Sequence, residues 1–432
     1  MMDTLTSIPK ARWWRIIPPT IIINLIAFMD RMNISFAMAG GMNEELGISL
    51  GIAGMAAGIF FIGYILLQIP AGHIAEKGYA KKYILFTIFA WGGISFLTGI
   101  VQNSWQLLIM RFLLGVAEGG VYPSILVIIA NWFPQKELGR ANSLFMLSLP
   151  IAAILTNMIS GFLVASFGWR SLFFIEGVVS LLLLLVWIPL MAESPEKAKW
   201  ISKEEKEYLT QRIAMERKER LDNYESHMHS TGSSVKELLS NKYLWIMTFI
   251  YLCHNTGQYG YSMWLPTIIK QLTHTGMTMV GFLSTPPFVL ALVGIYVFGM
   301  WSDKKGNRKL CATTAFFMFG SLLFVSTFFK TEIWIAYICL VLTGLFSKSI
   351  NSPFWSMAPT LFPPGMAGAA RGFINAFGNL GGFVGPTVVG WISAQAGDSM
   401  IGLYSLVIVL LIGAGLTRLL PVETSKFSDI DK

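Results

Sequence analysis

The stretch GMWSDKKGNRK, from Gly299 to Lys309, is a short basic loop that separates two long apolar runs. A similar stretch, GHIAEKGYAKK, extends from Gly72 to Lys82 and also separates two apolar runs. Each stretch follows the second apolar run of its half of the chain, so the two halves look like copies of one unit. Duplicated bundles of membrane-spanning helices are a common plan among transporters. The pattern predicts an all-helical membrane protein built from two related halves.

The composition of the 432 residues supports this prediction. Hydrophobic residues make up 54% of the chain and charged residues 13%, whereas a soluble domain has about 25% charged residues. The net charge of +8 does not require a nucleic-acid partner, because the basic residues lie in short loops between apolar runs. The three cysteines lack a metal-ligand spacing, and the chain has no P-loop or GxSxG motif. We therefore expect no metal, no cofactor and no enzymatic activity.

Twelve runs are long and apolar enough to cross a bilayer, for which a helix needs about 20 residues. They are residues 16–38, 52–71, 83–101, 105–130, 141–166, 170–191, 243–267, 278–300, 310–329, 332–359, 368–394 and 399–420. Residues 192–242 are polar and dense in both charge signs, which predicts a cytoplasmic linker with one or two amphipathic helices. The expected organisation is a six-helix bundle in residues 1–191, this linker, and a second six-helix bundle in residues 243–432.

Lysine and arginine set the expected orientation, because cytoplasmic loops carry an excess of both. The N-terminus and the loops after the second, fourth and eighth runs are basic, whereas the loop after the first run contains Glu44 and Glu45 and no lysine or arginine. Both termini should therefore face the cytoplasm. For a bacterial source the expected location is the cytoplasmic (inner) membrane, and a monomer in the lipid bilayer is the default.

We single out five charged residues within the apolar runs: Asp30, Arg31, Arg111, Glu118 and Lys348. A charge at the bilayer centre costs about 2.5–3.5 kcal/mol on insertion scales, so it needs a partner or a function. The first four lie in the N-terminal half; their charges sum to zero, and they could form a structural network. In such a network Arg111 could lock its helix to the first helix through Asp30. Alternatively, Arg31 could hold a substrate carboxylate in a fork of two hydrogen bonds.

Lys348 has no obvious acidic partner in the C-terminal half, where Asp303 and Asp398 lie in loops and Glu332 lies at the end of a run. It could snorkel to the cytoplasmic surface or pair with carbonyl groups of a broken helix. It could instead provide a second positive contact for a substrate held by Arg31. In the seventh run, Gln258 and Tyr259 lie beside glycines that soften the helix, and we regard both residues as candidates for substrate binding.

The two basic loops resemble the signature G-x-x-x-D-x-x-G-x-R-K of the major facilitator superfamily. The second loop has all five signature residues, at Gly299, Asp303, Gly306, Arg308 and Lys309. The resemblance covers nearly the whole chain. It implies the fold of that superfamily, with twelve membrane-spanning helices in two pseudo-symmetric halves, and transport by alternating access.

The first loop departs from this signature. Gly72 matches its first glycine, but Glu76 replaces the aspartate, and Gly78 and Tyr79 look exchanged. The exchange puts in doubt the tight turn that the signature usually forms. The residues to which the resemblance assigns conformational gating are Gly72, Glu76, Gly299, Asp303 and Arg308.

Three further segments are similar to motifs of the anion:cation symporter family within that superfamily. They are FMDRMNISFA (Phe28 to Ala37), GYILLQIPAG (Gly63 to Gly72) and RFLLGVAEGGVYP (Arg111 to Pro123). They resemble the family's D-R-x-N-x-x-x-A, Y-x-x-x-Q-I-P-G-G and R-x-x-x-G-x-x-E-x-x-x-x-P. Known members are proton-coupled permeases for hexuronates, aldonates and aromatic acids. The resemblance therefore implies a permease for a small organic anion.

The same resemblance suggests individual roles. Arg31 matches the residue that binds the substrate carboxylate, and Asp30 and Glu118 match the protonation sites, with Arg111 in the same coupling group. With Glu118 protonated, the charges of the N-terminal half carry a net positive charge that attracts an anion. Substrate and proton would then enter together. The positions that match cavity-lining residues of the family are Tyr64 and Asn375.

The expected function is uptake of a small organic anion, such as a sugar acid or an aromatic acid, together with protons. Sodium is an alternative coupling ion. An exchanger for phosphorylated or dicarboxylic anions would normally want a second arginine in the seventh helix, which is missing, although Lys348 could substitute. A drug or cation exporter fits poorly with the excess of positive charge. A transporter-like sensor, from a different class, would bind its ligand without moving it. The sequence does not name the substrate.

Overall fold

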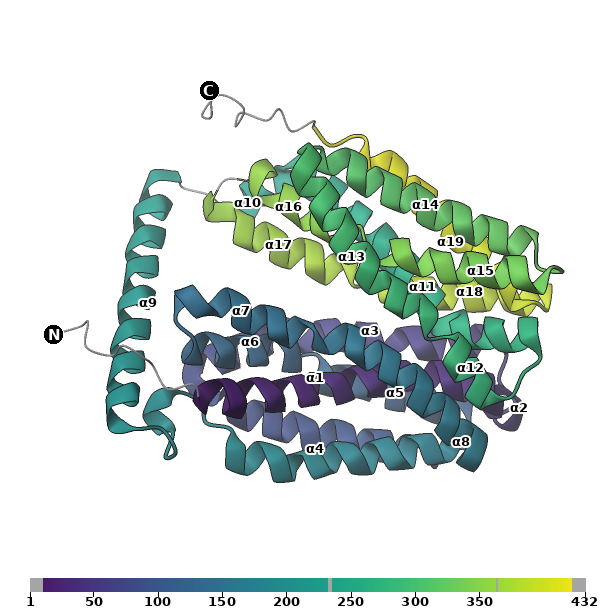
Figure 1. The fold of residues 1–432 in the computed structure, drawn as a ribbon, viewed down its shortest axis with the longest axis horizontal. Helices are drawn as coiled ribbons and strands as arrows, with labels where there is room; N and C mark the ends of the chain where they lie inside the picture. Colours follow the sequence, from purple (N-terminus) through teal and green to yellow (C-terminus); the bar gives the residue numbers. More distant parts are fainter. Residues whose placement is uncertain (1–10, 232–234, 363, 422–432) are drawn as a thin grey trace.

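The computed structural model describes residues 11–231, 235–362 and 364–421, and the regular elements within these ranges are all helices. Helices α1 to α8 form one bundle and helices α11 to α19 form a second, with α9 across one end of the molecule (Figure 1). The prediction of an all-helical fold is confirmed.

Long helices with short connections make up the N-terminal bundle. Its elements are α1 (Ala11–Ala37), η1 (Met38–Met42), α2 (Asn43–Glu45), α3 (Leu50–Ile74), η2 (Ala75–Tyr79), α4 (Ala80–Thr98), α5 (Ser104–Glu118), α6 (Val121–Trp132), α7 (Gln135–Met146) and α8 (Ser148–Leu190). Helix α8 bends at Gly168, whose φ of 80° and ψ of 169° are non-helical. The bend separates the fifth and sixth expected runs.

The linker and the C-terminal bundle follow the same plan. Their elements are η3 (Pro195–Lys197), α9 (Lys203–Thr231), α10 (Val235–Ser240), α11 (Lys242–Thr273), α12 (Met277–Leu283), α13 (Pro286–Lys305), α14 (Arg308–Phe328), α15 (Ile333–Ser347), α16 (Asn351–Leu361), α17 (Pro364–Gly378), α18 (Gly381–Ala396) and α19 (Ser399–Thr417).

The tight turn that the first basic loop put in doubt is present. Gly78 has a φ of 84° and Gly306, in the second loop, has a φ of 60°. Both values lie in the left-handed region, which glycine enters without steric strain. The first loop therefore makes its turn with a glycine one position earlier than the signature has it.

Eight helical segments within the described residues are long and apolar enough to cross a membrane. Two of them, Leu50–Thr98 with 49 residues and Gln135–Leu190 with 56 residues, each contain two of the expected runs. The expected runs 243–267 and 368–394 lie in α11 and in α17 with α18, outside these eight segments.

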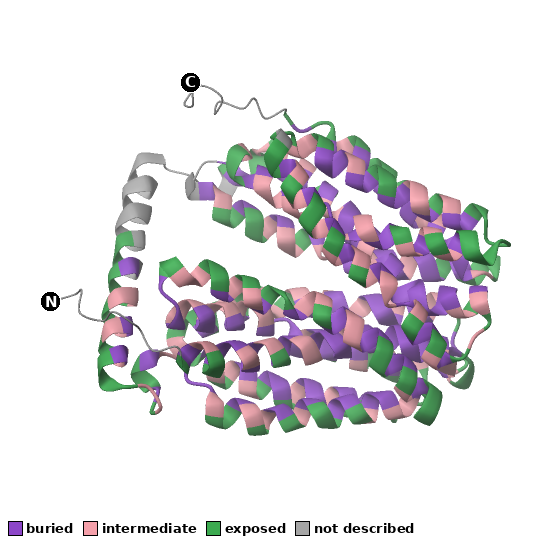
Figure 2. Cartoon of the chain, viewed as in Figure 1, coloured by how far each residue is buried: buried purple, intermediate pink, exposed green. Residues whose placement is uncertain are grey.

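Exposed residues alternate with less exposed ones along the outer helices of both bundles (Figure 2), and many of the exposed residues are large and apolar. Examples are Phe86, Phe89, Leu185, Tyr296 and Trp391. Large apolar patches are rare on soluble monomers, whereas lipid chains are as apolar as these side chains. The chain is a multi-pass membrane protein.

The two bundles meet at the end opposite to α9 and diverge toward α9 (Figure 1). Helix α3 packs against α18, and α8 packs against α12. Small residues allow the backbones to approach closely: a Cβ atom at Gly161 of α8 would lie 2.8 Å from Cα of Gly281 in α12. Lys270 adds a hydrogen bond of 2.6 Å from its Nζ to the carbonyl oxygen of Ala39. We call this end of the molecule the closed end.

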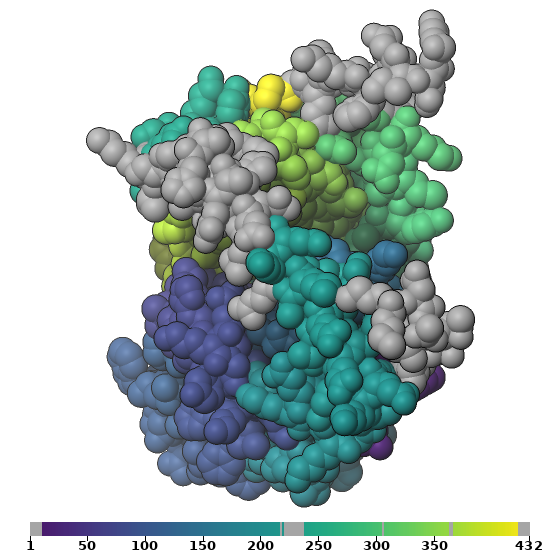
Figure 3. Space-filling view, turned by 90° about the vertical axis from the view of Figure 1, so that its left-hand side faces the viewer, coloured from purple at the N-terminus to yellow at the C-terminus, as the bar shows by residue number. Residues whose placement is uncertain are grey.

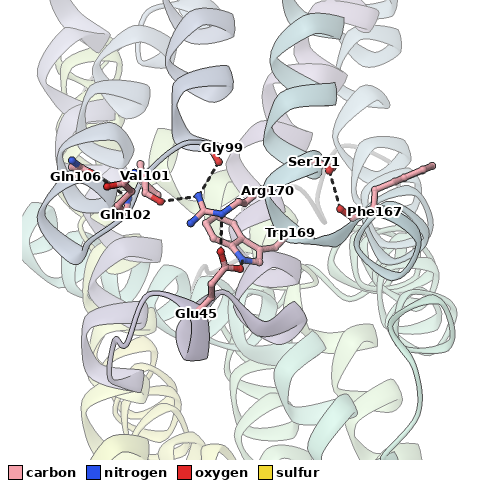
Figure 4. A network of polar contacts seen from close by, with 9 residues as sticks. All are labelled: Glu45, Gly99, Val101, Gln102, Gln106, Phe167, Trp169, Arg170 and Ser171. Carbon is pink, nitrogen blue, oxygen red and sulfur yellow. Dashed lines mark hydrogen bonds and ion pairs between the residues drawn. The ribbon is translucent and has the colours of Figure 1, made fainter.

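A polar network braces the closed end (Figure 4). The Nε of Arg170, just after the bend in α8, donates to Glu45 Oε1 at 2.8 Å, and its Nη1 donates to the carbonyl oxygens of Gly99 and Val101 at 2.9 and 2.8 Å. Trp169 Nε1 donates to Glu45 Oε2 at 2.6 Å. The network joins α8, α2 and the connection between α4 and α5.

The linker is attached to the N-terminal bundle by a buried arginine. Arg12 of α1 donates to Glu137 of α7 at 2.7 Å and to Glu205 of α9 at 3.1 Å. Figure 3, seen from the α9 side, shows the linker in teal against this bundle. The ion pairs therefore tie α9 to α1 and α7.

Candidate functional site

Asp30 and Arg31 are consecutive on α1, and consecutive residues of a helix point about 100° apart. Their side chains therefore enter different surroundings. Asp30 is completely buried and faces α4 and α8, whereas Arg31 is partly exposed and faces α3 and α5.

Arg31 is the centre of the candidate site. Its Nη2 donates to Glu118 Oε2 at 3.4 Å, and the Arg31 side chain is 13% exposed while that of Glu118 is fully buried. The guanidinium carbon lies 4.6 Å from the ring centroid of Tyr64, 5.0 Å from that of Phe60 and 6.0 Å from that of Phe28. The Arg31 Nε and the Glu118 Oε1 have no hydrogen-bond partner among the described residues. A guanidinium offers five N–H donors, so Arg31 has donors left for an incoming anion.

Lys348 reaches this site from the other bundle, where the expected tenth span breaks between α15 and α16. Its Nζ lies 6.0 Å from the ring centroid of Phe28. Arg31 approaches the same ring at the same distance, so the two cations are separated by no more than twice that distance. His254 Nε2 donates to the carbonyl oxygen of Ser347 at 2.9 Å and so holds the break in place. This location favours a second positive contact over a lysine that snorkels to the surface.

Helices α11 and α17 carry the remaining polar candidates. Tyr259 packs on Phe61 with ring centroids 4.3 Å apart, and it lies close enough to Arg31 to interact with its charge. Gln258 and Asn375 are half-buried, and within the described residues neither side chain makes a hydrogen bond. The structure thus brings Tyr259 to Arg31, whereas it shows no hydrogen bond from Gln258 or Asn375 to the site.

Arg111 of α5 holds the turn of α1 that carries Asp30 and Arg31. Its guanidinium donates to the carbonyl oxygens of Ala56 at 3.3 Å, Asp30 at 3.3 Å and Arg31 at 3.0 Å. The sequence suggested that Arg111 locks its helix to the first one through Asp30. The lock is present, but it uses the main-chain carbonyl of Asp30, because the Asp30 carboxylate faces the opposite side of α1.

A further buried acid, Glu176 of α8, was missing from the expected set. It accepts a hydrogen bond of 2.6 Å from Asn33 Nδ2, and Asn33 lies one turn along α1 from Asp30. The two Asp30 oxygens also accept from Ser95 at 2.9 Å and Ser180 at 2.8 Å. The four charges singled out from the sequence are therefore an incomplete set of the buried charges of the N-terminal half. Glu176 lies within the expected run 170–191, so the insertion cost of a charge identifies it from the sequence as well.

The gating candidates lie at the α9 end of the bundles rather than beside Arg31. They are Gly72 and Glu76 at the end of α3 and in η2, Gly299 and Asp303 in α13, and Arg308 at the start of α14. Arg308 Nη1 donates to a carbonyl oxygen of α16 at 2.8 Å, while Glu76 and Asp303 are exposed. Their role in gating stays a prediction.

Comparisons with known proteins agree with this architecture. The sequence matches the family described as Major Facilitator Superfamily over residues 20–386 and again over residues 268–429. It is 35% identical over 422 residues to a "Putative tartrate transporter" of Agrobacterium vitis, a match that covers 96% of this chain and 91% of the relative. It is 30% identical to a "Quinolone resistance transporter" of Acinetobacter baumannii, covering 96% and 95% of the two chains.

A solved structure has the same fold. It is the inward-facing, occupied form of a bacterial homolog of the human lysosomal transporter Spinster, with a TM-score of 0.74 over 96% of this chain and 97% of that one. The sequence identity is 15%, so this likeness concerns the fold alone.

Proposed function

The chain belongs to the major facilitator superfamily and is a membrane transport protein rather than an enzyme, and from this premise we propose that it takes up a small organic anion together with protons by alternating access. The observation that carries the proposal is the pairing of Arg31 with Glu118 between aromatic rings, with Lys348 approaching from the other bundle.

The ion pair between Arg31 and Glu118 is loose enough for a substrate carboxylate to replace Glu118 as the partner of Arg31. Its distance of 3.4 Å is longer than the ~2.7–2.9 Å of a strong charge-assisted hydrogen bond. An incoming carboxylate can replace Glu118 and accept two N–H groups of the guanidinium, whose planar fork matches it. Glu118, left buried without a cation, is then stabilised by taking up a proton. After substrate and proton leave, Glu118 returns to Arg31, and the empty carrier can reset.

Lys348 supports a substrate with two acidic groups. A second cation close to the Phe28 ring, on the opposite bundle from Arg31, suits a dianion that bridges the bundles. The relative from Agrobacterium vitis is named as a putative transporter of tartrate, a small hydroxy dicarboxylate. We propose hydroxy dicarboxylates of this size as the first substrate class to test.

We further propose that both termini face the cytoplasm of the inner membrane. The linker then lies on the cytoplasmic side, where the two bundles diverge (Figure 1). Residues 1–191 and residues 243–432 are proposed to rock against each other as two units. The closed end would open in the alternate state.

A second candidate function is drug export, which the quinolone resistance relative favours. The candidate site brings two cations from opposite bundles near one ring, and this arrangement argues against a cationic substrate. Anion exchange without protons is the third candidate, because the same two cations could hold either of two competing anions.

The first experiment measures binding by thermal shift of the purified protein with L-tartrate, galactarate, benzoate and a sulfonate. A ligand at 100 times its Kd stabilises the folded state by about 2.7 kcal/mol. Arg31→Ala should abolish the shift. Arg140→Ala is the matched control, because its guanidinium stacks on Trp13 at 5.1 Å instead of facing the site, and it should retain the shift. A shift that survives in Arg31→Ala would contradict the proposed anion site.

The second experiment measures uptake of the ligand found in this screen, in proteoliposomes with and without an inward proton gradient. Glu118→Gln should keep exchange of labelled for unlabelled substrate but lose accumulation against a gradient. Uptake that ignores the proton gradient and needs an internal counter-anion would instead identify an exchanger. Binding without any transport would identify a sensor, and efflux of a quinolone without anion uptake would identify an exporter.

A further inference from the structure

We propose that His254 of α11 is a positioning residue for Lys348, and that it thereby makes the candidate site selective for dianions over monoanions. The inference rests on the proposed function for the role of Lys348 as the second anion contact. The imidazole acts through the main chain next to Lys348, and its hold on that turn can be tested without any substrate.

The helix is interrupted where Lys348 leaves it. Helix α15 ends at Ser347 and α16 begins at Asn351. In an unbroken α-helix the carbonyl oxygen of Ser347 would accept from the N–H group of Asn351, four residues later. The N–H group of Asn351 instead donates to the carbonyl oxygen of Lys348 at 3.2 Å. The break therefore leaves the carbonyl group of the buried Ser347 without its helical partner.

His254 supplies the missing donor. Its side chain is fully buried, and its Nε2 lies 2.9 Å from the carbonyl oxygen of Ser347. A carbonyl oxygen can only accept, so the ring carries its proton on Nε2. The Nδ1 of the ring has no hydrogen-bond partner among the described residues. A residue that merely filled this space would not need a polar ring, because burying a polar group costs free energy unless it is hydrogen-bonded.

The same face of α11 holds both sides of the break. Tyr251, one turn before His254, stacks on Phe354 of α16 with ring centroids 5.4 Å apart. Two turns after His254, the hydroxyl group of Tyr261 donates to the carbonyl oxygen of Leu340 in α15 at 2.7 Å. The two tyrosines thus hold the helical segments, and His254 holds the turn between them.

The conformation of this turn decides where the Lys348 side chain points. Lys348 has a φ of −118° and a ψ of −3°, away from the helical values near −63° and −42°. From this conformation its Nζ reaches a point 6.0 Å from the ring centroid of Phe28. If the carbonyl oxygen of Ser347 accepted from Asn351 instead, α15 would continue into α16. The Cα–Cβ bond of Lys348 would then take a helical direction, and the ammonium group would leave its place near Phe28.

Selectivity follows because the two cations have different supports. Arg31 belongs to the N-terminal bundle, and Arg111 holds its carbonyl oxygen at 3.0 Å. Arg31 can therefore bind one carboxylate whether or not His254 holds the turn before Lys348. The second carboxylate of a dianion needs Lys348 in position. Loss of the hydrogen bond from His254 should therefore weaken the binding of dianions and spare that of monoanions.

The first test needs no ligand and separates the hydrogen bond from the bulk of the ring. Glutamine carries an N–H donor as many bonds from Cα as Nε2 of histidine, whereas the donor of asparagine is one bond closer to Cα. In the full chain in lipid, amide hydrogen exchange at residues 347–351 should be faster in His254→Asn and equal to wild type in His254→Gln. Unchanged exchange in His254→Asn, or equally fast exchange in both variants, would overturn the proposed hydrogen bond.

His274→Asn is the matched control. It is the same substitution on the same helix, at the exposed C-cap of α11 with a φ of 52°, a conformation that asparagine tolerates. Exchange at residues 347–351 should equal that of wild type. Faster exchange in this control would show that the substitution acts on α11 as a whole, which would overturn the specific role of His254.

Titration calorimetry then compares L-tartrate with its monoamide, which has the same carbon chain and one carboxylate fewer. His254→Asn should weaken tartrate binding at least ~5-fold, within the range that coupled neighbours show, and should weaken binding of the monoamide much less. His254→Gln and His274→Asn should match wild type for both ligands. Equal losses for the two ligands in His254→Asn would overturn the role in selectivity.

A double-mutant cycle tests whether His254 acts through Lys348. Residues that act through one contact have non-additive effects, so His254→Asn should cause no further loss of tartrate affinity in a Lys348→Met protein. A further loss by the same factor as in wild type would overturn the positioning role. If wild type binds neither ligand, the proposed function fails and the selectivity fails with it. The hydrogen-exchange result still decides whether His254 holds the turn.

Discussion

Alanine in place of Gly161 is expected to shift the protein away from the conformation described here. Gly161 lies on α8 where it crosses α12, and a Cβ atom there would lie 2.8 Å from both Cα of Gly281 and the carbonyl oxygen of Met277. Both neighbours are backbone atoms, so no side-chain rotation can relieve the overlap. The helices must separate, and this loosens the closed end that holds the bundles together.

The size of the effect follows from the overlap. Overpacking a tight contact costs about 1–3 kcal/mol. The contact joins the two bundles and is proposed to be absent when the closed end opens, so this cost falls on one conformation. A difference of ~1–3 kcal/mol changes the ratio of two states by about 5–150-fold. The gain in helix propensity from Gly to Ala, roughly 1 kcal/mol, acts in both states and cancels.

Spin labels on α7 and α17, which belong to different bundles, can measure this ratio (Figure 1). Gly139 and Gly368 are exposed and a Cβ at either meets no atom within 4 Å, so cysteines there should carry labels without strain once the three native cysteines are replaced. Double electron–electron resonance should show a long distance in the parent protein. In Gly161→Ala a shorter distance should gain population as the α9 end closes.

The control is Gly93→Ala, on the same bundle, where a Cβ meets no atom within 4 Å. It adds the same helix propensity without the clash and should leave the distances unchanged. An unchanged distance distribution in a folded Gly161→Ala protein would refute the claim that this contact selects the conformation. An equal shift in Gly93→Ala would trace the effect to helix propensity instead.

Three further predictions test single residues. Arg111→Lys should lower the free energy of unfolding by about 3 kcal/mol, because an ammonium group cannot reach all three carbonyl oxygens that accept from the guanidinium. Thermal unfolding in detergent measures this loss, and an unchanged melting temperature would contradict the bracing role. Lys348→Met should weaken the binding of a dicarboxylate at least ~10-fold, about 1.4 kcal/mol, and the binding of a monocarboxylate much less. Titration calorimetry measures both affinities, and equal losses would argue against a second anion contact. Arg12→Met should lower the free energy of unfolding by about 3–5 kcal/mol, because it leaves Glu137 and the buried Glu205 without their shared cation. Amide hydrogen exchange should increase first in α9. Protection of α9 equal to that in wild type would show that other contacts hold the linker.

The helices of this protein could be predicted from the sequence because each membrane-spanning helix satisfies its own backbone hydrogen bonds. Length and apolarity of a run are then enough to identify a span, whatever its neighbours are. The same holds for the turns at Gly78 and Gly306, where the left-handed backbone is a local property of glycine. The cost of inserting a charge into the membrane also identified Arg31, Glu118 and Lys348 as residues that require a partner or a function.

The partners of these charges depended on the tertiary structure. Helical periodicity gives the angle of a side chain around its own helix, but not which helix it faces, because packing against neighbouring helices sets rotation and tilt. Only the packed bundles place Lys348 and Arg31 beside one aromatic ring, turn Asp30 toward Ser180, and leave Arg111 with carbonyl partners. The sequence by itself thus determined the spans and the charges within them. The structure decided which charges share a site, because contacts between helices far apart in the chain form only when the bundles pack.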